Sequence, residues 1–279
     1  MALRASALLL AACAIMGAAS ASYRASIEQW RRHREAALTA DGGWLTVTGL
    51  FWLHEGFNTF GHGSSYDVDL PAEPELKNGG MFELRGGKVT MRMDGQTRTL
   101  APDTSGHPYI VRLGSLTWYV IQRGDRYGIR LKDRNSQLRK EFRGLHYFPI
   151  DPSYCIHTRL VPDPQKIRIA NVLGQVQDEP SPGYVSFVLH GRKLRLYPVE
   201  DSPGELSFIF RDLTSGKETY GAGRFLDVEL SKNGQIVLDF NKAYNPPCAF
   251  TPYATCPLPP KENRLDVRIE AGELKYGSH

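Results

Sequence analysis

From residue 44 onward, short apolar runs alternate with polar positions, and Gly, Asn, Asp or Pro interrupts them roughly every eight to twelve residues. This pattern is typical of antiparallel strands joined by tight turns, so the sequence predicts an all-β fold, mainly an antiparallel sandwich or barrel. The predicted strands are 82–84, 88–93, 110–113, 116–123, 127–132, 166–170, 183–189, 192–198, 205–211, 224–230, 236–239 and 265–269. Residues 231–234 read SKNG and predict a hairpin turn, because Asn-Gly tolerates positive φ.

One stretch, residues 23–38, has a helical period instead. Its less polar positions recur at helical spacing: Ile27, Trp30, His33 or Arg34, and Ala37. Asp41-Gly42-Gly43 follows and favours termination. We therefore expect a single N-terminal helix within residues 22–43.

The first 21 residues have the pattern of a secretory signal peptide. An apolar stretch at 5–19 follows Arg4, and Ala19-Ser20-Ala21 offers the small residues that signal peptidase requires. The prediction is an exported protein, periplasmic or secreted, that starts near Ser22 and has no transmembrane span. A second interpretation is a lipoprotein anchored at Cys13, which follows Leu10-Ala11-Ala12.

The remaining chain divides into two predicted β units with a soft boundary near Asn135. Residues 44–135 form the first unit, whose 49–71 stretch is faintly similar to the forkhead-associated sandwich, and residues 136–279 form the second. The 279-residue length suffices for either two medium domains or one large one.

Charge and motifs exclude some classes of function. Lys and Arg total 34 against 30 Asp and Glu, and because the two signs are interspersed along the chain, no basic tract predicts nucleic-acid binding. The eight His residues lack metal-site spacing, and neither a phosphate loop nor a nucleophile elbow is present. We predict no metal site, and the sequence indicates no particular cofactor.

The C-terminal half contains a long motif of aromatic, Pro and polar residues. Residues 212–226 read DLTSGKETYGAGRFL, residues 238–265 read LDFNKAYNPPCAFTPYATCPLPPKENRL, and residues 271–273 read AGE. This combination resembles the bacterial family known as domain of unknown function 1684, as do GWL at 43–45 and GLFWL at 49–53. The resemblance implies a family without an established reaction, substrate or cofactor.

Within this motif, the prolines predict a stiff, extended loop over residues 244–264. Rigid loops with aromatic and polar side chains often line pockets, although the same residues would also suit a cap over the end of a sandwich or barrel. The candidate ligand-binding residues are Arg224, Asp239, Asn241, Tyr244, Asn245, Tyr253, Glu262, Asn263 and Arg264.

The cysteines leave several states open. Cys248 and Cys256 are separated by seven residues in a loop that can turn back, so an exported chain favours a disulfide between them, with free thiols or a metal site as alternatives. Cys155 lies two residues from His157, which on a strand puts both on one face. Packing explains this pair more simply than nucleophilic catalysis does.

Three classes of function follow. The first is a non-catalytic protein that binds a small molecule or an envelope partner in an aromatic-lined cleft under the 244–264 loop. The second is a hydrolase that uses carboxylate, Tyr or Arg chemistry at the same loop, with Asp239 and Glu262 near Arg224 and Arg264. The third is a structural or assembly protein of the cell envelope. Whether the protein is an enzyme stays open at this level.

Overall fold

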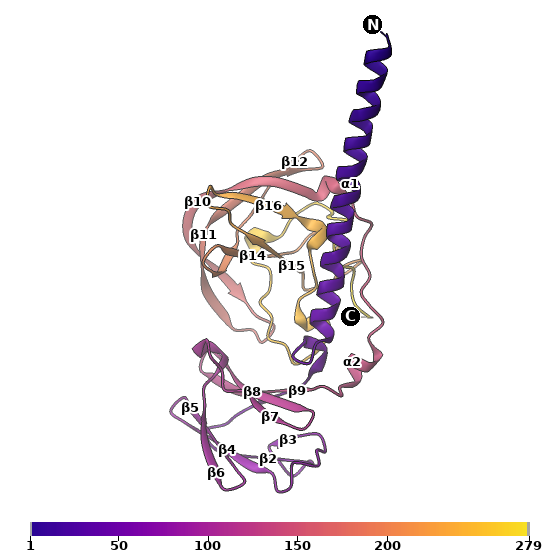
Figure 1. Cartoon of the computed structure of the whole chain (residues 1–279). Helices are drawn as coiled ribbons and strands as arrows, with labels where there is room; N and C mark the ends of the chain where they lie inside the picture. The colour runs from indigo at the N-terminus through magenta and orange to yellow at the C-terminus, as the bar shows by residue number, and fades with distance from the viewer. Residues whose placement is uncertain (1, 278–279) are drawn as a thin grey trace. The chain divides into compact units, whose positions relative to one another are not determined.

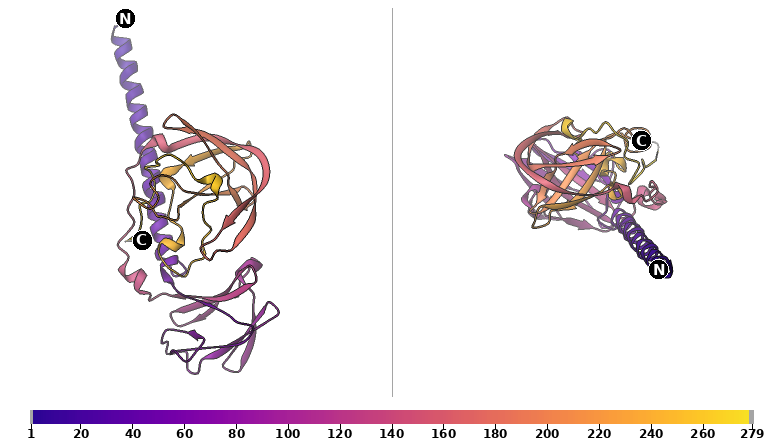
Figure 2. Two further views of the ribbon diagram at one scale, coloured as in Figure 1. Left: turned by 180° about the vertical axis from the view of Figure 1, so that it is seen from behind. Right: turned by 90° about the horizontal axis from the view of Figure 1, so that it is seen from above.

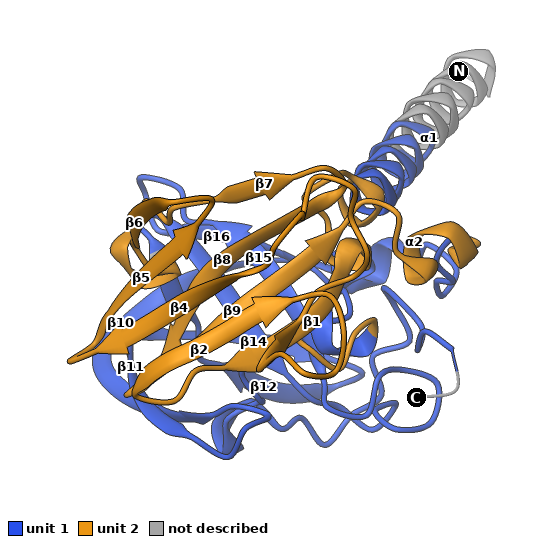
Figure 3. Cartoon of the chain, turned by 90° about the horizontal axis from the view of Figure 1, so that it is seen from below, with its two compact units in different colours: residues 1–36, 144–249, 255–279 blue, residues 37–143, 250–254 orange. Residues whose placement is uncertain are grey.

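The computed structural model describes residues 2–277, with side chains from residue 20 onward except at Asp201. The chain divides into two compact units, one of residues 1–36, 144–249 and 255–279 and the other of residues 37–143 and 250–254 (Figure 3). We call these unit 1 and unit 2. Nearly all of the predicted signal peptide, Cys13 included, lies outside the residues whose side chains are described, so export stays a prediction. Among the described residues, no helix is both long and apolar enough to cross a membrane.

Unit 2 is built from two antiparallel sheets, with one short parallel pair. One sheet has the order β1-β9-β8-β7 and the other β3-β2-β4-β5-β6. The strands are β1 (Val47–Trp52), β2 (Gly56–Gly61), β3 (Val68–Asp69), β4 (Gly80–Arg85), β5 (Lys88–Met93), β6 (Gln96–Leu100), β7 (Val111–Leu113), β8 (Leu116–Arg123) and β9 (Arg126–Asp133). The two sheets share one core, in which the rings of Phe60 and Phe82 lie 4.5 Å apart and Trp118 is fully buried.

Unit 1 contains helix α1 (Ala2–Thr39) up to residue 36 and a second set of strands. These strands are β10 (Cys155–Ala170), β11 (Val176–Leu189), β12 (Arg192–Leu196), β13 (Val199–Ser202), β14 (Glu205–Phe210), β15 (Arg224–Glu229) and β16 (Gln235–Asp239). Short helix α2 (Gln137–Glu141) belongs to unit 2 and is capped by Ser136, which accepts from Arg139 N.

The strands of unit 1 form a barrel wall with one opening. One sheet has the order β12-β11-β10-β16 and the other β13-β14-β15. Because only Tyr197 and Pro198 separate β12 from β13, the chain passes directly from one sheet into the other. Long strands β10 and β11 bend around the interior (Figures 1 and 2). Within the described residues no ladder joins β15 to β16, so the wall is open between these two edge strands.

The interior of this barrel is filled from both sheets. Phe187 of β11, Phe210 of β14 and Phe240 form a ring cluster, with centroids 5.7 Å apart for Phe187 and Phe240 and 5.5 Å for Phe210 and Phe240. Leu226 of β15 and Ile236 of β16 are buried in the same core. Their burial follows from the period of two, which sends even-numbered residues of β15 and β16 inward.

The all-β prediction with one N-terminal helix is confirmed, and the helix ends at Thr39, one residue beyond the expected end. The strand predicted over residues 265–269 was wrong, because this segment has no regular ladder. Leu265, Val267 and Ile269 are nevertheless buried there, so their alternation reflects an extended segment packed on the core. Sequence reasoning also missed β1 and β2, where three glycines weaken the strand signal.

Candidate functional site

The motif residue Arg224 is a structural cation at the centre of unit 1. Its guanidinium is fully buried, pairs with Asp212 at 3.3 Å, and donates to the carbonyl oxygens of Ala271 and Ile269. Asp212 in turn accepts from Ile269 N at 2.7 Å and from Thr214 Oγ1 at 2.9 Å. The pair therefore fixes the extended C-terminal segment, where no strand ladder satisfies the backbone.

A second buried pair fastens α1 to the same segment. Arg34 donates to Glu273 at 3.0 Å and to the carbonyl oxygen of Asn245 at 2.8 Å, while Glu273 also accepts from Asn245 N at 2.8 Å. Glu273 is fully buried, and the Arg34 guanidinium lies 4.6 Å from the centre of the Tyr244 ring. Asn245 Nδ2 donates to the carbonyl oxygen of Leu274. Asn245 and Tyr244 thus hold α1 and the C-terminal segment together.

Asp239 and Asn241 form a further cluster beneath α1. The Tyr23 hydroxyl donates to Asp239 Oδ1 at 3.0 Å, and Asn241 Nδ2 donates to the Tyr23 oxygen at 2.9 Å. Burial raises the pKa of Tyr23 far above its ordinary value, and the charge of Asp239 adds to this effect. The Tyr23 hydroxyl therefore remains protonated and acts as a donor. Burial is also the main cause that raises the pKa of the neighbouring Cys155 thiol.

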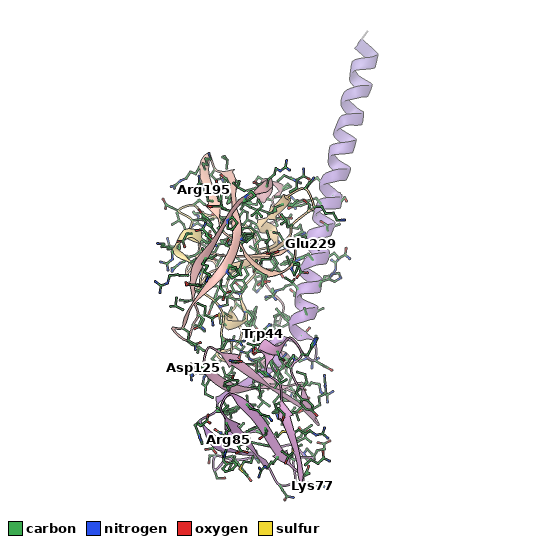
Figure 4. All side chains as sticks on the ribbon, turned by 90° about the vertical axis from the view of Figure 1, so that its left-hand side faces the viewer. Trp44, Lys77, Arg85, Asp125, Arg195 and Glu229 are labelled. Atoms are coloured by element: carbon green, nitrogen blue, oxygen red, sulfur yellow. The ribbon has the colours of Figure 1, made fainter. Side chains whose placement is uncertain are left out.

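The opening between β15 and β16 is a cleft of about 800 Å³. Asp227, Glu229 and Asp239 place carboxylates along it, whereas Arg159 and Lys242 bring positive charges and His157 brings an imidazole ring. Trp30 of α1 provides an aromatic wall, and Val228 and Leu230 provide apolar surface. Figure 4 shows Glu229 on this unit. The cleft therefore combines both signs of charge with apolar contacts, which suits an amphoteric ligand.

Only Asp239 of the nine predicted site residues lines this cleft. Tyr244 is not in the lining, but it contacts the strand that forms one side of the cleft. Its hydroxyl donates to Oδ2 of the lining residue Asp227 at 2.6 Å, and its backbone exchanges two hydrogen bonds with Phe225. No residue of the 244–264 segment belongs to its lining.

The remaining predicted residues lie elsewhere. Asn263 is buried and joins three backbone groups, accepting from Tyr197 N and donating to the carbonyls of Tyr197 and Ile209. Glu262 pairs with Lys261 at 3.8 Å in a short 3-10 helix (Lys261–Asn263), and Arg264 is exposed. Tyr253 belongs to unit 2, where its carbonyl accepts from Arg130.

The predicted Cys248–Cys256 disulfide is not present in the structure, and neither of these residues nor Cys155 forms a disulfide. Cys248 N donates instead to Cys256 Sγ at 3.2 Å. The hydrogen bond with Cys256 lowers the pKa of the Cys248 thiol. A backbone donor directed at one sulfur explains how the loop brings the two residues close without a covalent bond. Among the described residues no group of three or more His, Cys, Asp or Glu side chains is arranged to hold a metal.

Sequence reasoning missed most residues of the cleft. Asp227 and Glu229 alternate with apolar residues on β15, and Val237 does so on β16, a pattern that reads as an ordinary solvent face. One sequence feature does point to this part of the fold: the hairpin turn predicted at residues 231–234, which joins β15 to β16. Nothing in the sequence indicates that the two strands separate beyond the turn.

Comparison with known protein families supports the resemblance that was based on the C-terminal motif. Residues 140–274 match the family described as "Protein of unknown function (DUF1684)", and the chain belongs to this family. The matched region lies mostly in unit 1, so the resemblance expected at residues 43–53 falls outside it.

A solved structure with sequence similarity is the solution NMR structure of an uncharacterised protein of Haloarcula marismortui. It is 32% identical, with 50% of this chain and 81% of that one covered, at a TM-score of 0.41. No curated protein matches the chain.

Proposed function

We propose that this protein is an exported binding protein whose binding site is the β15–β16 cleft of unit 1. The observation that supports the proposal is the opening itself: a barrel wall that lacks a ladder at one position and leaves a cleft of about 800 Å³ there. Ligand pockets of proteins fall in this range of volume. The proposed site differs from the one expected under the 244–264 loop, which contributes no lining residue.

The surroundings of the cleft favour a rigid, preformed site. One end is closed by the turn, where Ser231 N donates to the carbonyl oxygen of Gln235 at 3.1 Å. Near the other end, Phe225 and Tyr244 exchange backbone hydrogen bonds of 2.8 and 2.9 Å. Because both ends are fastened, ligand binding need not order the site, and the part of the entropic cost that comes from ordering the protein is small.

The test is native mass spectrometry of the full chain, purified from the compartment in which it accumulates. The proposal expects a co-purifying mass in the wild type and its loss in Val228→Trp, since Val228 is partly buried in the cleft lining. The matched control is Val188→Trp, because Val188 is a 62% exposed valine of β11 outside the cleft. A mass retained in both variants would place the ligand elsewhere. If the wild type and both variants all carried no co-purifying molecule, a structural role in the envelope would be favoured.

A further inference from the structure

One side of the cleft is a row of side chains on the outer face of β10. His157 lies opposite Val237 of β16, and Arg159 lies opposite Gln235. Directly opposite residues of an antiparallel pair point to the same face of the sheet. All four side chains are exposed, so this face is the outer one. The row on β10 therefore brings one guanidinium and one imidazole beside the apolar surface of Val237.

The other side of the cleft, on β15, is acidic. Asp227 and Glu229 are both exposed and, because they are two residues apart on a strand, they share the outer face. Glu205 of β14 lies directly opposite Glu229, which places two like charges side by side. Like charges at such positions destabilise a sheet. A cation bound at this row would therefore relieve a repulsion.

A charged group on each side is fixed in place by hydrogen bonds. Asp227 accepts from Ser207 Oγ at 2.8 Å and from the Tyr244 hydroxyl at 2.6 Å, one bond to each carboxylate oxygen. Arg159 Nη2 donates to the carbonyl oxygen of Asn233, in the β15–β16 turn, at 2.6 Å. Among the residues whose side chains are described, neither Asp227 nor Arg159 forms a salt bridge. Opposite charges are thus positioned on the two sides of the cleft without a partner of opposite sign.

Near α1, the charges of the lining offset each other. Asp239 is buried and accepts from the Tyr23 hydroxyl. It also caps the 3-10 helix Phe240–Lys242, in which residues three apart lie on the same side. The Lys242 ammonium therefore lies on the side of the Asp239 carboxylate and compensates its charge. The uncompensated groups are the acidic row on β15 and Arg159 on β10.

We propose that the cleft binds a small zwitterion, with its ammonium against Asp227 and Glu229 and its carboxylate against Arg159. This inference rests on the proposed function, and it names the class of ligand. His157 lies in the same row as Arg159, and its imidazole N–H can donate a second hydrogen bond to the carboxylate. Val237 is 43% exposed on β16, between the two rows, so the part of the ligand that joins the two charges should be apolar.

The spacing of the strands sets the length of this ligand. Paired strands lie about 4.8 Å apart, and β16 separates β10 from β15, so the backbones of the two rows are about 10 Å apart or more. The hydrogen bonds that anchor Arg159 and Asp227 oppose a movement that would close this distance. An α-amino acid, whose charged groups share one carbon, is too short to reach both rows. A zwitterion with several methylene groups between its charges can bridge them.

The first experiment titrates ω-amino acids of increasing length into the ¹⁵N-labelled full chain and follows the Trp30 indole and Val237 amide signals by NMR. The series is glycine, 4-aminobutanoate, 6-aminohexanoate and 8-aminooctanoate. Hexylamine and hexanoate, which carry one charge each, are the control ligands. The inference expects the affinity to rise from glycine to a maximum among the two longest zwitterions. It expects each control ligand to bind at least about tenfold more weakly than 6-aminohexanoate.

Two variants assign the ends of the ligand. Arg159→Gln should weaken binding of hexanoate and 6-aminohexanoate about tenfold and leave hexylamine unchanged, whereas Asp227→Asn should weaken hexylamine and 6-aminohexanoate and leave hexanoate unchanged. The matched controls are Arg195→Gln on β12 and Asp125→Asn in the β8–β9 turn of unit 2, both exposed, outside the cleft and labelled in Figure 4. Neither control should alter any affinity. Circular dichroism of all four variants verifies the fold.

Three results would overturn the zwitterion. Equal affinity across the series, or equal affinity for the single-charge ligands, would show that the two rows do not act together. Binding that Arg159→Gln and Asp227→Asn leave unchanged would place the probes outside the cleft. No binding of any probe, together with a co-purifying molecule that Val228→Trp loses, would refute the zwitterion and leave the cleft as the binding site. No binding and no co-purifying mass would refute the proposed function as well.

Discussion

The buried Arg224–Asp212 pair makes a quantitative prediction about stability. Both side chains are fully buried, and Arg224 also donates to the carbonyl oxygens of Ala271 and Ile269. Arg224→Met retains most of the side-chain length but leaves a buried carboxylate without its cation and two carbonyls without their donor. Removing one partner of a buried ion pair costs about 3–5 kcal/mol. That is a large part of the about 5–15 kcal/mol that stabilises a typical domain.

The assay is urea unfolding of the full chain, followed by far-UV circular dichroism. With a slope of about 2 kcal/mol per M, the midpoint of unit 1 should fall by about 2 M. Hydrogen exchange of β14 and β15 assigns the transition to unit 1. Arg224→Lys keeps the charge but loses the guanidinium geometry, so its midpoint should lie between those of the wild type and Arg224→Met.

The matched control is Arg192→Met. Arg192 also pairs with an aspartate, Asp266, at 3.0 Å, but the two side chains are 54% and 74% exposed. An exposed pair of this kind contributes less than about 1 kcal/mol because water and salt screen it. Equal shifts in the midpoint for Arg224→Met and Arg192→Met would refute the structural role assigned to the buried pair.

Two further predictions concern backbone and thiol chemistry. Gly272 and Gly234 have φ of 83° and 77°, but a Cβ at Gly272 would overlap the carbonyl oxygen of Ala243, whereas the space around Gly234 is open. Gly234→Ala should cost about 1 kcal/mol in urea unfolding and Gly272→Ala at least about twice that, and equal costs would contradict the packing described. In iodoacetamide labelling across pH 6–9, Cys248 should react at lower pH than Cys155, because hydrogen bonding lowers the pKa of Cys248 and burial raises that of Cys155; the reverse order would contradict these environments.

The strand content could be predicted because alternation and turn residues are local properties. The turn at residues 231–234 illustrates this, since Asn-Gly alone predicts the positive φ observed at Gly234. The irregular segment at residues 265–269 was misread as a strand for the same reason. Its alternation matches a strand, but it makes only isolated backbone bonds, Leu265 N to Arg211 O and Leu213 N to Val267 O, and Ile269 N donates instead to the side chain of Asp212.

The candidate site was harder to predict because burial of polar groups is a tertiary property. Arg224, Asn241 and Asn263 have the side chains of a binding site, yet each is buried and hydrogen-bonded to backbone or to another side chain. Such residues are needed wherever a loop enters the core without a ladder. The cleft, in turn, depends on the separation of β15 from β16, which no local pattern encodes.

The most direct test of the central claim, that the β15–β16 cleft binds a ligand, is site-specific photocrosslinking in cells. The photoreactive residue benzoylphenylalanine replaces Val237 at the cleft edge or, as control, the exposed Val188 of β11. The prediction is one defined adduct at position 237, identified by mass spectrometry, absent at position 188 and lost when Val228→Trp fills the cleft. No adduct at position 237, or the same adducts at both positions, would contradict the claim.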